Sequence, residues 1–242
     1  MSDTVYYEKP VLLDRDKHRL ARVARPQRPY GFAAQTQFIP AVVDEFVPAC
    51  RELAILFMAG SGRPNAVFVV GFNAGQNLLV TPEGEWDGTY VPAFVRRYPF
   101  IRGDVEGAEP IICIDASYDG LNEQQGEPFF EGETQTPYLE AQVNFVNAYF
   151  EASRRAEEFS DSLQKLELFK SISIDVKSPG SSLALHGMLA LDEEKLNALP
   201  AKEFEKLRKA GWLPAIYAHL ISLGSVGRLS AKLDAKRKGL NA

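Results

Sequence analysis

The clearest pattern of hydrophobic and polar positions lies just past the middle of the chain. Apolar side chains recur there at alternating spacings of four and three, which predicts one face of an amphipathic helix of about eight turns. Thr136 suits the N-cap, Pro137 the first helical position and Glu140 the positive end of the helix dipole. The residues of this face are Phe145, Tyr149, Ala152, Ala156, Phe159, Leu163 and Leu166.

Short apolar runs separated by Gly, Pro and Asn dominate the part of the chain before this helix. They predict neighbouring strands joined by tight connections. The continuous run at 111–114 indicates a strand buried on both faces, and the polar, glycine-dotted stretch 119–135 indicates a loop. The expected strands are 6–13, 53–59, 66–72, 77–81 and 111–114.

Helices are expected mainly in the C-terminal half, after two further strands at 171–176 and 183–191. Pro214 opens a final helix that buries Ile216, Leu220 and Leu223 and frays into a basic tail. The other short helices are expected at 41–51, 92–98, 192–199 and 201–210.

This order of elements predicts an α+β fold. We expect a mainly antiparallel sheet covered by one long amphipathic helix, with a C-terminal helical cap. The 242 residues fit a single domain over 1–242, with a possible subdivision into a strand-rich part, 1–135, and a helix-rich part, 136–242.

The composition is that of an ordinary soluble protein, with 45% hydrophobic and 24% charged residues. Cys50 and Cys113 lie in apolar surroundings, which predicts two buried free thiols. The N-terminus lacks a signal-peptide pattern, and no apolar run is long enough to span a membrane. We therefore expect a cytoplasmic protein without membrane insertion, with signal-less export left open.

The net charge of −5 is unevenly distributed. Residues 14–30 and residues 228–242 each sum to +4, although neither run carries interleaved aromatic residues. Such runs are typical of solvated surface, so nucleic acid is not an expected partner.

Motifs for catalysis and cofactors are missing from the sequence. There is no nucleophile elbow and no phosphate-binding loop. The three histidines share no metal-ligand spacing. We expect neither a metal nor a cofactor.

The pair Arg96-Arg97 is the best candidate for a site because aromatic residues surround it in the sequence. On a short helix the two guanidinium groups diverge by about 100°, so at most one faces the interior. A buried arginine needs a carboxylate or a bound anion. Either an internal carboxylate such as Glu45 pairs with it, or it grips an anionic ligand in an aromatic-walled pocket. The candidate ligand-binding residues are Arg96, Arg97, Tyr98, Trp86, Tyr90 and Glu45.

His219 is the second candidate. It lies one helical turn from both Ile216 and Leu223, so its ring borders the core. It is either a core histidine with satisfied nitrogens, or the acid–base of an enzyme in which Arg97 anchors an anion.

Several short motifs along nearly the whole chain resemble the SapC family of bacterial proteins. The most distinctive are Arg96-Arg-Tyr-Pro-Phe100 and Tyr217-Ala-His-Leu220. Others are Pro10-Val-Leu-Leu-Asp14, Glu45-Phe46, Tyr90-Val-Pro-Ala93, Gly126-Glu-Pro-Phe129 and Gly211-Trp-Leu213. Leu53-Ala-Ile55 departs from the family, where Tyr-Pro-Ile would be expected.

The resemblance implies a role more than a reaction. The family is named from surface-layer loci, and related genes often lie beside TonB-dependent receptors and tryptophan-halogenase-like flavoproteins. No catalytic residues carry over. We expect a non-catalytic accessory or binding protein of an envelope or uptake locus, with an unknown protein partner or a small anionic ligand. The alternatives are the enzyme using Arg97 and His219, and a structural surface-layer protein.

Overall fold

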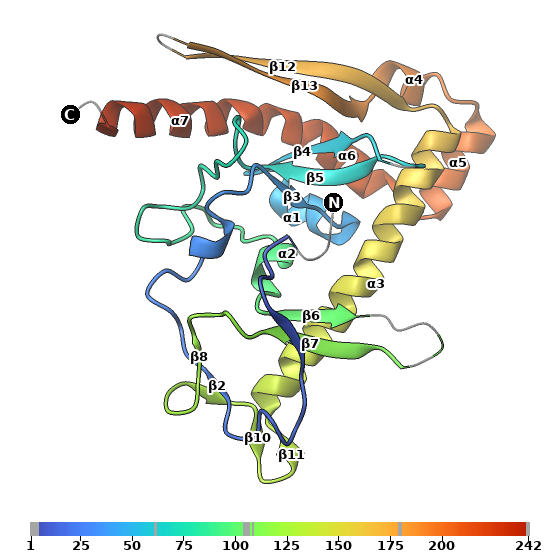
Figure 1. Ribbon diagram of the computed structural model, residues 1–242. Coiled ribbons are helices and arrows are strands. Elements are labelled where there is room, and N and C mark those ends of the chain that lie inside the picture. The colour runs from blue at the N-terminus through green and yellow to red at the C-terminus, as the bar shows by residue number, and fades with distance from the viewer. Residues whose placement is uncertain (1–4, 61, 104–106, 108, 179–180, 241–242) are drawn as a thin grey trace.

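The computed structural model describes residues 5–60, 62–103, 107, 109–178 and 181–240. Within them the chain folds into antiparallel sheets linked by one long helix and covered by C-terminal helices (Figure 1). The predicted α+β class and the predominance of antiparallel pairing are confirmed.

The largest sheet has five strands in the order β12-β13-β4-β5-β3. The bounds are β3 Phe38–Pro40, β4 Ala54–Met58, β5 Asn65–Val69, β12 Phe169–Ser178 and β13 Ser181–Leu191. β4 and β5 pair along their full length, from Ala54 opposite Val69 to Met58 opposite Asn65. β13 meets β4 only at Met188 and Leu189, and this short contact leaves backbone groups farther along both strands to find other partners.

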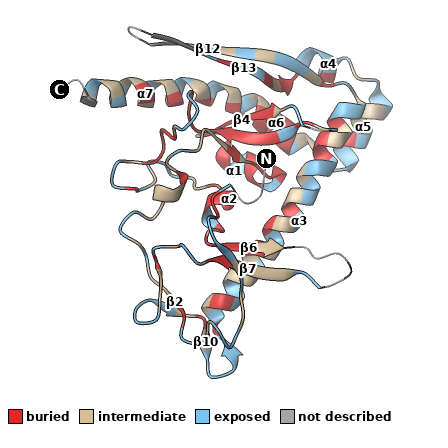
Figure 2. Cartoon of the chain, in the orientation of Figure 1, coloured by how far each residue is buried: buried red, intermediate tan, exposed pale blue. Residues whose placement is uncertain are grey.

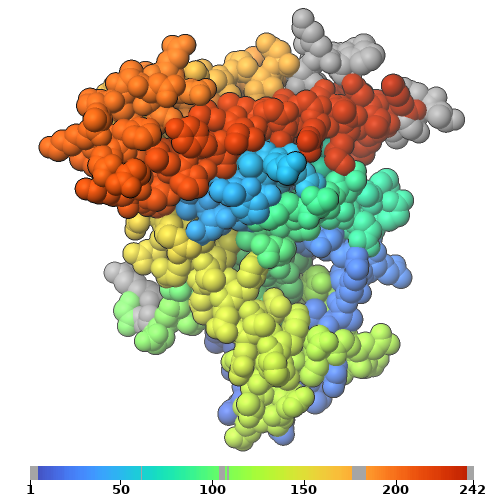
Figure 3. Space-filling view, turned by 180° about the vertical axis from the view of Figure 1, so that it is seen from behind, coloured from blue at the N-terminus to red at the C-terminus, as the bar shows by residue number. Residues whose placement is uncertain are grey.

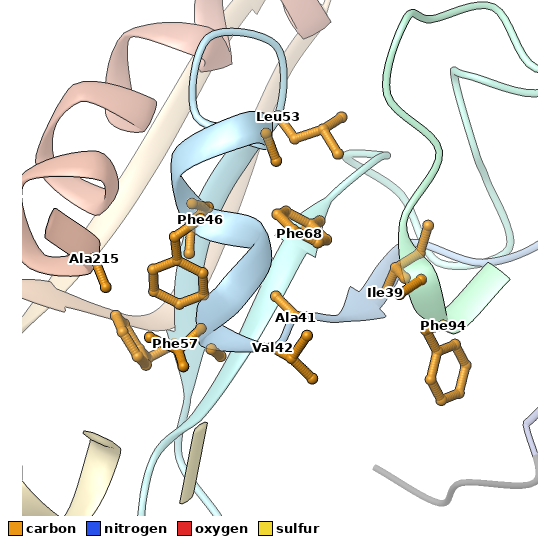
Figure 4. Close-up of a cluster of buried hydrophobic side chains, with 14 of the residues drawn as sticks. Ile39, Ala41, Val42, Phe46, Leu53, Phe57, Phe68, Phe94 and Ala215 are labelled. Carbon is orange, nitrogen blue, oxygen red and sulfur yellow. The ribbon is translucent and has the colours of Figure 1, made fainter. Parts of the chain in front are cut away.

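Successive side chains of β4 and β5 point to opposite sides of the sheet, and both faces of the sheet are apolar. Ile55, Phe57 and Phe68 belong to the main core cluster. Figure 4 shows Phe46 and Ala215 beside Phe57. The opposite face belongs to a second cluster that includes Leu229 and Leu233 of the last helix, together with Ala54, Leu56, Val67 and Val69. A sheet covered on both sides explains why β4 and β5 read as nearly continuous apolar runs. Figure 2 shows the resulting concentration of buried residues around β4 and α1 (Phe46–Ala49).

Smaller sheets lie at the other end of the molecule. β1 (Pro10–Leu12), β7 (Ile111–Asp115) and β6 (Phe100–Gly103) form a three-stranded sheet in that order. The short remaining strands are β2 Arg22–Val23, β8 Leu121–Asn122, β9 Glu127–Pro128, β10 Phe130–Glu131 and β11 Thr134–Gln135.

The long helix α3, Pro137–Lys165, connects the two ends of the molecule (Figure 1). Its predicted start is confirmed, because the Thr136 hydroxyl accepts a hydrogen bond from the backbone N–H of Leu139. Of the predicted apolar face, Tyr149, Ala152, Phe159 and Leu163 are buried, and the others pack partly buried against the core.

The C-terminal helices cover the five-stranded sheet. They are α4 Glu193–Asn197, α5 Ala201–Lys209, α6 Leu213–Ser222 and α7 Val226–Leu240. The prediction that one final helix frays into the basic tail is wrong. Instead, the 3-10 turn Leu223–Ser225 separates α6 from α7, and α7 continues along the sheet because Leu229 and Leu233 bury their side chains there.

Several local predictions also need correction. The helix expected at 41–51 is a 3-10 turn, Val43–Glu45, followed by the four residues of α1, and it ends at Cys50. The strand expected at 77–81 is reduced to a single bridge between Val80 and Trp86. Asn77 explains part of this result, since its side-chain oxygen accepts a hydrogen bond from Leu79 N–H and its amide bonds Ala33 O, which holds the backbone in a loop.

The three-stranded sheet corrects two further predictions. Ile111 and Ile112 of β7 are only half-buried, because this small sheet has too little protein around it to cover both faces. Cys113 is half-buried for the same reason, while Cys50 is buried, and both thiols are free. The stretch 119–135 is not wholly loop, since it includes β8 to β11.

Candidate functional site

The two adjacent arginines lie at the end of the short helix α2, Ala93–Arg96. Arg97 is 3% exposed, whereas Arg96 is exposed. The prediction that at most one of them faces the interior is confirmed. Their separation follows from the helical twist between consecutive residues.

Arg97 is held among aromatic rings. Its guanidinium carbon lies 4.2 Å from the ring centre of Phe94, 4.6 Å from that of Tyr149 and 6.0 Å from that of Tyr7. Cation–π attraction is strongest where water is excluded, as it is here. Arg97 therefore ties α2 to α3 and to the N-terminal segment.

Glu45 is the buried carboxylate of this region, with 4% exposure. Its Oε1 accepts hydrogen bonds from the Tyr90 hydroxyl at 2.8 Å and from Ala93 N–H at 2.6 Å. Burial raises the pKa of Glu45, and these hydrogen bonds act in the opposite direction. Glu45 thus holds the segment before α2 through a phenol and a backbone amide. Asp44, its neighbour, instead pairs with Arg155.

A cavity of about 430 Å³ opens beside the exposed arginine. Four tyrosines and Phe32 give it aromatic walls, and Arg25 and Arg96 are its charged lining residues. No acidic residue lines this cavity in the described part of the chain. The lining residues are Val23, Ala24, Arg25, Pro26, Pro29, Tyr30, Phe32, Val95, Arg96, Tyr98, Tyr118 and Tyr138.

Tyr98 is the best-anchored ring of the cavity. Its hydroxyl donates to Asp115 Oδ2 at 3.2 Å, and its ring lies 4.1 Å from Phe32 and 5.4 Å from Tyr118, measured between ring centres. Asp115 is fully buried at the end of β7. Burial pushes the pKa of Asp115 upward, but the hydrogen bonds from Ser117 and from two backbone amides outweigh it and lower the pKa. Asp115 is therefore an ionised anchor.

Arg96 lines the cavity, and its charge also stabilises the ionised form of the buried Glu45. Its Nε donates to Val91 O at 2.9 Å, and its guanidinium lies 4.9 Å from the ring centre of Phe145. Arg96 forms no ion pair with any described residue. Arg25 also lines the cavity, but it pairs with Glu85 at 2.6 Å. Arg96 is thus the guanidinium that a ligand can engage.

Trp86 and Tyr90 stand one layer behind the cavity wall. The indole N–H of Trp86 donates to Tyr90 O at 2.9 Å, and the Trp86 ring lies 5.9 Å from the ring of Tyr30. These residues support the lining, but they are not part of it. Among the predicted site residues, the cavity therefore brings together Arg96 and Tyr98, while Arg97, Glu45, Trp86 and Tyr90 brace the surrounding structure.

The phenols of Tyr98, Tyr118 and Tyr138 are neutral at physiological pH. Burial raises the pKa of Tyr138 to about 12 and also raises the pKa values of Tyr98 and Tyr118. Neutral phenols donate hydrogen bonds and offer apolar ring faces. The arrangement suits a planar anion that places a carboxylate at Arg96 and an apolar body against the rings.

His219 serves a different part of the molecule. It is fully buried between β4 and β13, where Leu191 N–H donates to its Nε2 at 3.0 Å and its Nδ1 lies 3.0 Å from Ile55 O. Burial lowers the pKa of His219 to about 4, so the ring is neutral. Both nitrogens are occupied by backbone groups, as in the core histidine that the sequence also allowed. None of the described cavities is lined by both His219 and Arg97.

Within the described residues, no three His, Cys, Asp or Glu side chains are grouped so that they could hold a metal ion. No helix in this part of the chain combines the length and apolar character needed to cross a membrane.

Sequence reasoning missed much of the cavity. Tyr30, Tyr118 and Tyr138 come from three separate segments, and nothing in their local pattern links them. Asp115 was also missed, although a signal existed: it is a lone carboxylate directly after the apolar run 111–114. A polar residue at the end of an apolar strand is well placed to bind nearby backbone.

The fold and the cavity together define an α+β protein with an aromatic, arginine-bearing cavity. The SapC family model matches residues 13–229, and the chain belongs to this family. No curated protein and no solved structure matches the chain.

Proposed function

We propose that this protein is a non-catalytic binding protein whose cavity beside Arg96 takes a small anionic ligand with an aromatic or otherwise flat apolar body. The observation that carries the proposal is the composition of the cavity. Four tyrosines and one phenylalanine surround a guanidinium that has no ion-pair partner in the described structure.

The charge balance supports an anion as the ligand. Cavities of 300–1,000 Å³ with apolar walls and a few placed polar groups are typical of small-molecule sites. A carboxylate can accept two parallel hydrogen bonds from a guanidinium, which fixes its orientation as well as its position. The neutral phenols add donors at the same surface.

The geometry gives the enzyme hypothesis no comparable support. Arg97 is enclosed by rings and His219 has both nitrogens bound to backbone, so neither side chain faces a shared space in which a substrate could react. A binding role in an accessory protein, which fits the family's envelope-associated and uptake-associated setting, needs only the cavity.

Mass spectrometry of small molecules that remain bound after gentle purification tests the proposal. We expect the wild-type chain to carry an anionic compound that is lost from Arg96→Ala. The matched control is Arg19→Ala, an exposed arginine outside the cavities described here, which should keep the compound. Equal retention by Arg96→Ala and by the control would contradict the proposal, as would a retained compound with no negative charge.

A further inference from the structure

A second cavity, of about 460 Å³, lies where the end of α1, the start of β4 and α7 meet. It shares no lining residue with the cavity at Arg96. Figure 3 shows the α1 segment directly against the strip formed by the C-terminal helices. The apolar lining combines the exposed Pro48 with five buried side chains: Leu53, Ala54, Val69, Leu79 and Leu229.

Cations line the same space. Arg51, Arg228 and Lys232 all contribute to the lining, and Glu52 is the acidic residue among the lining side chains. A patch of apolar floor bordered by cations is the pattern that an amphiphilic anion matches.

The carboxylate of Glu52 is already engaged. It accepts hydrogen bonds from Thr89 N–H at 2.8 Å, from Tyr90 N–H at 3.0 Å and from the Thr89 hydroxyl. Glu52 therefore fixes the loop before α2 and forms no ion pair with the arginines beside it.

Of the three cations, only Lys232 has a carboxylate partner in the described structure, namely Asp87. Arg51 and Arg228 are exposed, and neither forms an ion pair with a described residue. The guanidinium groups of Arg51, in the turn after α1, and of Arg228, in α7, thus border an apolar cavity. Neither has a carboxylate partner among the described residues.

We propose that this second cavity binds a small amphiphile with one anionic head group and a short alkyl chain. The head group engages Arg51 and Arg228, and the chain covers the floor formed by Leu53, Val69 and Leu229. Burying each methylene supplies the affinity, and the guanidinium groups select the anion.

α7 forms one wall of the cavity and packs on the sheet through few buried side chains. Among its described residues, Leu229 and Leu233 are the buried ones. A ligand that contacts α7 and β4 together adds to this small contact. Binding should therefore slow amide hydrogen exchange in α7 more than in α3.

Calorimetric titration of the full chain with monomeric decanoate, octanoate and 1-decanol tests the inference. We expect one decanoate per chain, and an affinity that falls about fourfold for each methylene removed, the equivalent of ~0.8 kcal/mol. The neutral 1-decanol should bind about tenfold more weakly, because it cannot pair with two guanidinium groups.

Variants separate the two parts of the site. Arg51→Gln and Arg228→Gln should each weaken decanoate binding about fivefold, while Arg19→Gln should leave it unchanged. Ala54→Leu extends a side chain into the cavity and should abolish binding of decanoate; because Ala54 is buried, the added bulk should also lower the melting temperature. A melting scan of every variant shows whether it remains folded.

Three results would overturn the inference. One is the absence of decanoate binding to the folded wild-type chain. Another is equal binding of decanoate and 1-decanol, or decanoate binding that the arginine variants do not change. The third is binding to vesicles that contain anionic phospholipid but not to free decanoate, which would indicate contact with a lipid surface instead of a small-molecule cavity.

Discussion

Polar side chains lie among aromatic rings in two places, between β4 and β13 and in the cavity beside Arg96. The two places differ in whether the polar groups find partners within the protein. Between the strands, the His219 ring lies 5.2 Å from the ring of Phe57, and both of its nitrogens meet backbone groups. At the cavity, Tyr98 is anchored while Arg96 faces open space with no ion-pair partner among the described residues.

The difference separates stability from binding. A buried polar group whose bonds are all made internally fixes the fold and leaves nothing for a ligand. A polar group that lines a cavity and keeps a free bonding capacity can recognise one. The motifs Tyr217–Leu220 and Arg96–Phe100 are equally prominent in the sequence. The first contributes His219 to the stability of the fold, whereas the second contributes Arg96 to the cavity.

The largest expected effect comes from removing the histidine that joins the strands. His219→Leu leaves Leu191 N–H and Ile55 C=O buried without partners, which should lower the free energy of unfolding by about 4 kcal/mol. Urea denaturation measures the loss. The control is His186→Leu at an exposed position of β13, where the change should be small. A loss for His219→Leu no larger than that of the control would refute a structural role for His219.

The titration of His219 should also make the stability of the protein depend on pH. Its pKa is about 4 in the folded chain and about 6.5 when unfolded, so the unfolded state takes up the proton first as the pH falls. Stability is therefore full above about pH 6.5 and should decline by about 3 kcal/mol on the way to pH 4. Subtracting the pH profile of His219→Gln, which lacks this titration, isolates the contribution. Parallel profiles for the two proteins would show that the ring is not buried in its neutral form.

Substitutions of the two adjacent arginines should differ in their effect on stability, because Arg97 is buried and Arg96 is exposed. Arg97→Ala removes a cation held among three aromatic rings and should lower the free energy of unfolding by about 2 kcal/mol. Arg96→Ala should change it by less than about 0.5 kcal/mol, because the side chain is exposed. Chemical denaturation of both variants provides the comparison. Similar losses for the two would contradict the division of roles.

The smallest effect concerns the ring that both anchors and lines the cavity. Tyr98→Phe keeps the ring but removes one hydrogen bond to Asp115, which retains its other donors, so the loss should be about 1 kcal/mol. Tyr118→Phe is the matched control, since the Tyr118 hydroxyl makes no hydrogen bond with the described residues. A thermal denaturation series compares them. A loss for Tyr118→Phe as large as that for Tyr98→Phe would show that the bond to Asp115 is not the cause.

Much of the fold was predictable because its signals are local. The period of α3, its Thr136 cap and the apolar runs of β4 and β5 each lie within a few consecutive residues. The interruption after α6 and the loop at Asn77 were not predictable, because they depend on where distant partners allow the backbone to bond.

The candidate site was predictable only in part. The twist of a short helix was enough to separate Arg96 from Arg97, and the sequence also singled out Tyr98. The contributions of Tyr30, Tyr118 and Tyr138 depend on the folded arrangement of three distant segments, for which a single sequence carries no local pattern.

Fluorescence of Trp86 offers the most direct test of the cavity, because its ring contacts that of Tyr30 in the cavity wall. In a Trp212→Phe background, where Trp86 is the remaining tryptophan, the chain is titrated with 3-phenylpropanoate and with the neutral 3-phenylpropan-1-ol. The account predicts that the carboxylate binds about fivefold more tightly and that Arg96→Gln, but not Arg19→Gln, removes this preference. Equal binding of the two compounds, or a preference that survives Arg96→Gln, would contradict it.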